Sequence, residues 1–259
     1  CIFCISQPHL ALIIAFKGMN AMSHLPHTLK LGLDALFPNF CISCQNHIQA
    51  DQALCQYCLD DLNLFDLTHH PNLLHRPDIC DAFPDSNFDH LIACAWYQAP
   101  FKLWLKQLKF NDQQYFRVAL QQVIQRQLQL AHQVNSSWPD LFIVLPLHNQ
   151  RFLARGFNQV SQTWLPVLKN QQCTVSSALY KQKATKAQSQ LSKAKRVKNL
   201  HNAFVCQQDL TGKTVAIIDD VMTSGATINA ATEAIKHAGA KQVWAMLTCL
   251  TGLGNLHYD

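Results

Sequence analysis

Residues 219–227, DDVMTSGAT, combine two adjacent carboxylates with a glycine and three hydroxyl side chains, a pattern suited to phosphate binding. Gly225 lets the backbone come close to an oxygen, and Thr223, Ser224 and Thr227 offer hydroxyl donors. Loop amides followed by a helix N-terminus bind phosphate well, because the first N–H groups of a helix lack intrahelical partners. The stretch therefore predicts a phosphate-binding loop.

The two carboxylates, Asp219 and Asp220, would repel a phosphate and are therefore expected to face a different group. An ionised carboxylate only accepts hydrogen bonds, and the vicinal hydroxyls of a ribose are suitable donors. Both carboxyls have an ordinary pKa of about 3.9, but their closeness should raise the pKa of one, and a magnesium ion could relieve the repulsion. A sugar with a 5-phosphate and free hydroxyls fits the whole stretch; an acidic helix-capping turn without a ligand is the alternative.

The elements that would position this loop alternate between strand and helix. Residues 213–220 predict a strand, residues 227–240 a helix of period 3.6 that Gly239 ends, and residues 242–250 the next strand. Residues 141–145 are all apolar, which is typical of a strand buried on both faces of a parallel sheet. The expected fold class is therefore α/β with a parallel sheet.

Other predicted elements belong to the same domain. Residues 91–98 predict a strand, and residues 100–133 predict one or two helices with an apolar stripe and a Gln-rich, solvated opposite face. The stripe consists of Phe116, Leu120, Val123, Ile124, Leu128 and Ala131. A further helix is expected to begin near Asn158, and Pro166 inside it can produce a kink.

Four cysteines form two Cys-x-x-Cys pairs separated by ten residues. Each pair can offer two thiolates to one ion, so two pairs supply the tetrahedral sulfur ligation that suits zinc. Buried free thiols would not explain the double pairing, and disulfides are disfavoured in a cytoplasmic protein. The predicted ligands of a structural zinc are Cys41, Cys44, Cys55 and Cys58. Surface positions are expected for His47, His69 and His70, and core positions for Cys80, Cys94, Cys173, Cys206 and Cys249.

A basic segment, residues 181–198, carries seven basic residues and no acidic one. A solvated loop is one interpretation, and contact with pyrophosphate or with the backbone of a single-stranded nucleic acid is the other. The segment contains no Phe, Trp or Tyr for stacking on bases, so nucleic-acid binding is expected to be weak, salt-sensitive and indifferent to sequence. The basic residues are Lys181, Lys183, Lys186, Lys193, Lys195, Arg196 and Lys198.

The composition limits the class of protein. With 259 residues, of which 49% are hydrophobic, the chain can form one sizeable core and a small accessory module. Charged residues make up 14%, and the net charge of +5 favours anionic partners only mildly. The apolar run at residues 10–16 is far shorter than the roughly 20 residues of a membrane span, and the residues before it lack the Lys or Arg of a secretory signal. We therefore expect a cytoplasmic location and no membrane span.

Differences in composition and motifs divide the chain into four regions. An extension of poorly defined structure covers residues 1–34, of which residues 1–18 precede Met19 and Met22 and are interpreted as upstream translated sequence outside the working protein. The Cys4 zinc-binding module is expected at residues 35–75, a Pro-interrupted linker at residues 76–88 and the α/β domain at residues 89–259.

Four motifs in this order resemble the competence protein F (ComF) family. They are the four-cysteine knuckle, PLHNQRFLARGFNQ, the stretch ATKAQSQLSKAKRVKNLHNAF and VAIIDDVMTSGATI, the last of which looks like the phosphoribosyl pyrophosphate signature of type I phosphoribosyltransferases. The third stretch keeps Thr185, Gln188, Leu191, Arg196 and Asn199 in the order of the family. The resemblance covers roughly residues 35–250 and implies a type I phosphoribosyltransferase-like domain preceded by a small zinc-binding module.

The resemblance implies roles for the residues at matching positions. Asp219 and Asp220 would hold the ribose hydroxyls and, in an active transferase, would serve as catalytic residues that stabilise developing charge together with Mg²⁺. The 5-phosphate would lie against Thr223, Ser224, Gly225, Ala226 and Thr227, and the pyrophosphate near Arg151, Arg155 and Gly156.

Two functions stay open on this basis. A ComF-like protein would contain a pocket for phosphoribosyl pyrophosphate and act in DNA uptake, natural transformation or the use of external DNA. Its partners would be single-stranded DNA and other DNA-uptake proteins. A catalytically active phosphoribosyltransferase of nucleotide salvage is the alternative, although no aromatic or polar cluster of the sequence marks a site for an acceptor base or amine.

Overall fold

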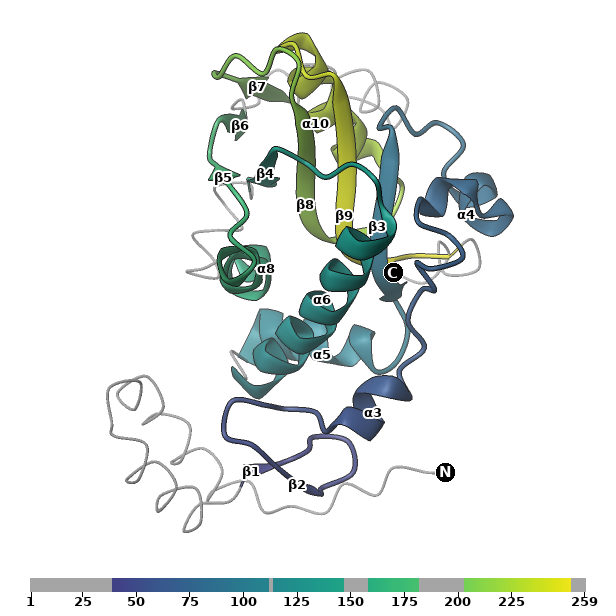
Figure 1. Cartoon of the computed structure of the whole chain (residues 1–259), viewed down its shortest axis with the longest axis vertical. Coiled ribbons are helices and arrows are strands. Elements are labelled where there is room, and N and C mark those ends of the chain that lie inside the picture. The colour runs from purple at the N-terminus through teal and green to yellow at the C-terminus, as the bar shows by residue number, and fades with distance from the viewer. Residues whose placement is uncertain (1–38, 112–113, 147–157, 182–202, 253–259) are drawn as a thin grey trace, which may run out of the picture. The chain divides into compact units, whose positions relative to one another are not determined.

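The computed structural model describes residues 39–111, 114–146, 158–181 and 203–252 (Figure 1). The expectations for residues 1–34, including those for residues 1–18, lie outside these ranges. The chain divides into two compact units, Cys1–Asp61 and Leu62–Asp259. In the first unit, β1 (Asn39–Phe40) and β2 (His47–Ile48) form an antiparallel pair, and α3 (Gln56–Asp60) follows.

A five-stranded parallel sheet forms the centre of the second unit. Its strand order is β3-β9-β8-β4-β5, and all four pairings are parallel. Most side chains of the two central strands are buried, which agrees with the expected parallel sheet covered on both faces. The strands are β3 (His90–Trp96), β4 (Leu141–Val144), β5 (Val175–Ser176), β8 (Thr214–Met222) and β9 (Gln242–Leu250).

The helices of this unit cover both faces of the sheet. They are α5 (Phe101–Asn111), α6 (Gln114–Val134), α8 (Gln159–Asn170) and α10 (Ala226–His237). The connections from β3 to β4 and from β4 to β5 run one way along the sheet, and the connection from β8 to β9 runs the other way. Because parallel crossovers are right-handed, α10 lies on the face opposite α5, α6 and α8. Figure 1 shows α10 behind β8 and β9.

The reversal of direction places a topological switch point between β4 and β8. These two strands are neighbours, and the chain leaves them toward opposite sides. In open α/β sheets a crevice opens at this point, beyond the carboxyl ends of the strands, and ligands bind there. The carboxyl end of β8 carries Asp219 and Asp220. The topology therefore places residues 219–227, the predicted phosphate-binding loop, at the switch point.

Glutamine side chains of α6 hold the elements around it. Pro166 of α8 has no N–H, so the carbonyl of Gln162 loses its helical donor, and the side chain of Gln121 on α6 donates to that carbonyl over 2.8 Å. Gln127, which is only 3% exposed, donates to the carbonyls of Phe65 and Cys94. Gln125, Gln129 and Gln133, on the opposite face of α6, are exposed as expected, whereas Gln127 lies on the apolar stripe beside Ile124 and Ala131.

The segment that follows the first unit is structured. It contains η2 (Leu73–His75) and α4 (Pro77–Ala82), and it buries Ile79, Phe83 and Phe88. Residues 76–88, expected as a linker, thus supply apolar side chains to the second unit. Pro77 does not prevent this, because it occupies the first turn of a helix, where no N–H is needed.

Two short strands flank the basic segment. β6 (Leu179–Lys181) and β7 (Phe204–Cys206) form an antiparallel pair in which Lys181 is opposite Phe204. Residues 182–202 lie outside the described ranges.

Two further sequence expectations can be compared with the described residues. Cys94 and Cys249 are buried as expected, but Cys80 is exposed and Cys173 and Cys206 are only partly buried, so the core assignment is wrong for these three. Within the described ranges, no helix combines the length and apolarity needed to cross a bilayer.

Candidate functional site

The four cysteines of the Cys-x-x-Cys pairs come together in the first unit. The Sγ atoms of Cys41, Cys44, Cys55 and Cys58 all lie within 4.8 Å of one another, and those of Cys44 and Cys55 are 3.6 Å apart. A tetrahedral zinc with Zn–S bonds of about 2.3 Å separates its sulfur atoms by about 3.8 Å. The predicted ligand set therefore has the spacing that zinc requires.

The local backbone builds this cluster. Gln45 adopts a positive φ of 62° in the turn after Cys41, and Cys55 is the N-cap of α3, where its sulfur accepts from the amide of Cys58 over 3.5 Å. The amide of Cys55 also donates to Cys41 Sγ over 3.4 Å. Burial by itself would raise the pKa of Cys41, but backbone amides, including that of Cys44, outweigh it and lower the pKa to about 7. These amides thus favour the thiolate of Cys41, whereas burial raises the pKa of Cys58 to about 12.

Strand β8 directs the two carboxylates to opposite sides. The strand continues past them to Met222, and successive side chains of a strand point to opposite faces of the sheet. Asp219 lines a pocket on the side of α10. Asp220 contacts Lys109 of α5 and Gln159 of α8. The structure thus separates two side chains that the sequence assigned to one pair of ribose hydroxyls.

Asp220 is bound within the protein. Its Oδ2 atom lies 2.9 Å from Lys109 Nζ and accepts from Gln159 Nε2 over 2.6 Å. The side chains of Asp220 and Lys109 are only 13% and 19% exposed, so water replaces little of this contact. Burial alone would raise the pKa of Asp220, but the Lys109 ammonium and the Gln159 amide outweigh it and hold the pKa below its ordinary value.

The pKa of Asp219 is shifted in the opposite direction to that of Asp220. Burial, followed by the charge of Asp220, raises the pKa of the Asp219 carboxyl well above its ordinary value. Asp219 Oδ1 accepts from the amide of Asp220 over 2.8 Å, which fixes the orientation of the carboxyl. The expectation that one carboxyl of the pair has a raised pKa is confirmed, and this carboxyl is the one that faces the pocket.

The turn from β8 into α10 has the features of a phosphate-binding loop. Gly225 is the N-cap of α10 with φ of 73°, a conformation that favours glycine, and it has no side chain to occupy the first N–H groups of the helix. Thr251 Oγ1 donates to the carbonyls of Met222 and Thr223 over 3.2 Å each, which holds the start of the loop against the end of β9.

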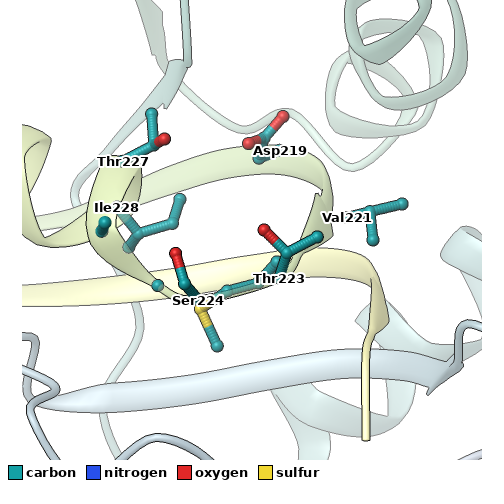
Figure 2. A pocket seen from close by; sticks show the side chains of 9 residues that line it. Asp219, Val221, Thr223, Ser224, Thr227 and Ile228 are labelled. Atoms are coloured by element: carbon teal, nitrogen blue, oxygen red, sulfur yellow. The ribbon is translucent and has the colours of Figure 1, made fainter. Parts of the chain in front are cut away.

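These groups surround one pocket. Figure 2 shows the hydroxyls of Thr223, Ser224 and Thr227 and the carboxylate of Asp219 around the same hollow. Its cavity volume is about 40 Å³, far below the roughly 300–1,000 Å³ of pockets for drug-sized ligands, so it has room for one end of a larger molecule. Val221, Met222, Gly225, Ala226 and Ile228 complete the lining.

Some of the residues singled out in the sequence lie outside the described ranges. They are Arg151, Arg155, Gly156, Lys183, Lys186, Lys193, Lys195, Arg196 and Lys198. Lys181 lies at the end of β6, where its Nζ atom is 5.6 Å from the centroid of the Phe204 ring.

Lys109 and Gln159 were not among the site residues predicted from the sequence. A signal for Lys109 was present, because it lies four residues after Leu105 and so shares a helix face with that buried residue. Gln159 opens α8 directly after its N-cap Asn158, and a helix start in an α/β sheet lies near the carboxyl edge.

A parallel α/β domain with a glycine-capped turn at its switch point, together with a Cys4 module, is the architecture of a phosphoribosyltransferase-type domain preceded by a zinc-binding module. Comparison with known families agrees with both parts. The phosphoribosyl transferase domain matches residues 159–254, and the double zinc ribbon domain matches residues 32–69. The second match and the Cys4 cluster together support a structural zinc.

Curated relatives of this chain carry names that refer to DNA utilization or to competence. The DNA utilization protein YhgH of Escherichia coli O157:H7 is 29% identical over 214 residues, which cover 82% of this chain and 90% of that protein. Competence protein F of Haemophilus influenzae is 26% identical over 230 residues, which cover 81% and 97%. Competence protein ComFC of Streptococcus pneumoniae is 31% identical over 108 residues, which cover 39% and 44%. The chain is a homologue of these competence proteins, as the resemblance in its motifs predicted.

Proposed function

We propose that this protein binds phosphoribosyl pyrophosphate in the pocket between β8 and α10. The observation that carries the proposal is the convergence of a free helix N-terminus, three hydroxyls and the carboxyl of Asp219 at the topological switch point of the sheet. The match to the phosphoribosyl transferase domain over residues 159–254 supports it.

In this proposal each part of the ligand has a partner. The 5-phosphate accepts from the amides of the first turn of α10 and from the hydroxyls of residues 223–227. The Asp219 carboxyl binds the ribose hydroxyls, and the Asp220 carboxylate, held by Lys109, supports it without reaching the ligand. Mg²⁺ fits this donor set, since it typically binds one or two carboxylates plus phosphate oxygens, and it would neutralise the charge of the pyrophosphate. Arg151, Arg155 and Gly156 are proposed to contact the pyrophosphate.

We propose DNA uptake or the use of external DNA as the biological role, with a cytoplasmic location. The names of the homologues support this role. The basic residues of segment 181–198 would contact either the pyrophosphate or single-stranded DNA, and in the latter case affinity falls with salt with a slope of roughly −0.7 per phosphate contact. Competition between the two ligands would indicate that they share the segment.

A nucleobase panel separates this role from nucleotide salvage. The protein is incubated with Mg²⁺, phosphoribosyl pyrophosphate and each base, and pyrophosphate release is measured. We expect binding without release, and we expect a deletion strain to lose transformation or growth on DNA without requiring a purine. Release with any base, or a purine requirement in a strain that transforms normally, would instead make salvage the function.

Asp219→Asn is expected to weaken the binding of phosphoribosyl pyrophosphate and to stabilise the ligand-free protein. Loss of a hydrogen bond to a charged group removes about 1.5–3 kcal/mol of binding free energy, which calorimetry with phosphoribosyl pyrophosphate and Mg²⁺ measures. A raised pKa means that the folded state holds the proton more tightly, so ionisation of Asp219 at neutral pH lowers stability, and asparagine removes that cost.

The gain in stability should therefore depend on pH. It is expected to be largest at pH 7 and to vanish below the unfolded pKa of about 3.9, where the wild-type carboxyl is protonated in both states. Asp209→Asn is the matched control, because this exposed carboxylate caps its own turn at Thr211 and has a lowered pKa. Unchanged affinity in Asp219→Asn would place the ligand elsewhere.

A further inference from the structure

The segment of residues 83–89 runs along α10 and is joined to its first turn by an asparagine pair. The amide of Asn87 donates to Asn229 Oδ1 over 3.2 Å, and Asn87 Nδ2 donates to the Asn229 carbonyl over 3.1 Å. Asn229 Nδ2 donates in turn to the carbonyl of Asp85 over 2.8 Å. These three bonds, which we call the Asn87–Asn229 clamp, connect positions 142 or more residues apart in the chain.

A second set of contacts anchors the same segment away from the first turn of α10. Lys236, in the last turn of α10, donates to the Asn87 carbonyl over 2.7 Å and lies 3.1 Å from Asp89 Oδ1. Asp89 also pairs with Val243 of β9, accepting from its amide and donating to its carbonyl over 2.8 Å each. Residues 83–89 are therefore anchored independently of the clamp, through β9 and the last turn of α10.

The clamp acts at the part of α10 that forms the pocket. Asn229 directly follows Ile228, which lines the pocket, and its amide donates to the Gly225 carbonyl over 2.8 Å, the bond that opens the helix. Phe83, at the start of the segment, is 5% exposed and packs beside Gly225, where a Cβ atom would come within 3.9 Å of its ring. The segment thus contacts both the N-cap and the first turn.

We propose that residues 83–89 position the first turn of α10 for phosphate binding, with Asn87 and Asn229 as positioning residues. The proposal rests on the proposed function of this pocket. Phosphate affinity at a helix N-terminus depends on several amides pointing at one place at once. A turn that is already ordered loses less conformational freedom on binding, so more of the interaction appears as affinity. A segment expected to be a linker thereby becomes part of the ligand site.

The test compares the two ends of the same helix. Asn87→Ala removes the bond donated by Asn87 Nδ2, and Asn229→Ala removes the two bonds made by the Asn229 side chain. Lys236→Met removes the contacts of the last turn and serves as the control. Hydrogen exchange of the unliganded protein reports the amides of Thr227 and Ile228, and calorimetry with phosphoribosyl pyrophosphate and Mg²⁺ reports affinity. We expect faster exchange at both amides and about 5- to 20-fold weaker binding in the asparagine variants, from one or two lost hydrogen bonds.

Lys236→Met is expected to lower the melting temperature while leaving exchange at the first turn and affinity unchanged. Equal effects of Lys236→Met and the asparagine variants on both readouts, or wild-type exchange in the asparagine variants, would show that the clamp has only a structural role. A wild-type protein that binds no phosphoribosyl pyrophosphate would defeat the proposed function, and the exchange measurement would still decide whether the clamp orders the turn. If Asn229→Ala does not fold, Asn87→Ala removes the remaining bond of the clamp, from Asn87 Nδ2 to the Asn229 carbonyl, and gives the answer.

Discussion

Replacing Cys41 or Cys58 with serine is expected to release zinc and unfold residues 39–61, while the α/β domain stays folded. A structural zinc contributes on the order of 10–16 kcal/mol to small zinc-binding modules, far more than the packing of so few residues can supply. The two compact units of the chain make a partial loss of structure feasible. Metal analysis, together with circular dichroism of the whole chain before and after addition of a chelator, measures the effect.

Cys80→Ser is the matched control for the zinc prediction. Cys80 is an exposed cysteine of α4 that does not belong to the Cys4 cluster, so its replacement should leave the zinc content at one ion per chain. Purified wild-type protein without stoichiometric metal, whose Cys41 and Cys55 react freely with an alkylating agent under native conditions, would contradict the assignment.

Lys109→Met is expected to destabilise the second unit by about 3–5 kcal/mol at pH 7. The substitution keeps the length of the side chain but leaves the Asp220 carboxylate, 13% exposed, without its cation. Urea unfolding at constant protein concentration measures this change. The loss should shrink in acid, because the lowered pKa of wild-type Asp220 contributes stability above the unfolded pKa of about 3.9 and loses it as the pH falls through the folded pKa.

A double variant tests whether the charge is the cause. Lys109→Met combined with Asp220→Asn removes both charges and keeps the size of both side chains, so most of the lost stability should return. If the double variant is as unstable as Lys109→Met alone, the packing of the lysine stem, and not the ion pair, holds α5 against β8.

The strand, turn and helix around the pocket could be predicted from the sequence because each has a local signal. The apolar run before Asp219 and the 3.6-residue period after it fixed β8 and α10, and Gly239 follows the helix with φ of 96° as expected. Asn158 caps α8 by accepting from the amide of Val160 over 3.0 Å, so the helix begins where it was expected. Local propensity and capping decide these features, and both are visible in a single sequence.

The different environments of Asp219, which lines the pocket, and Asp220, which pairs with Lys109, could not be predicted in the same way. It depends on whether β8 ends at Asp220, as predicted, or continues to Met222, a difference of two residues that propensity does not resolve. It also depends on Lys109, which lies 110 positions before Asp219 and has no sequence signal that names its partner. The ordered structure of residues 83–89 could not be predicted for a related reason, because its hydrogen bonds to α10 connect distant parts of the chain.

The proline inside α8 has a consequence for the order of folding. Because of Pro166, no N–H of α8 donates to the Gln162 carbonyl, whose donor is Gln121 of α6. An isolated α8 would therefore lack this bond and be a weak helix. We therefore expect α8 to become fully hydrogen-bonded only when it docks on α6, which makes its formation cooperative with an element 41 residues away. In a kinetic experiment, Gln121→Ala should then slow refolding if that docking precedes the transition state, and speed unfolding if it follows the transition state.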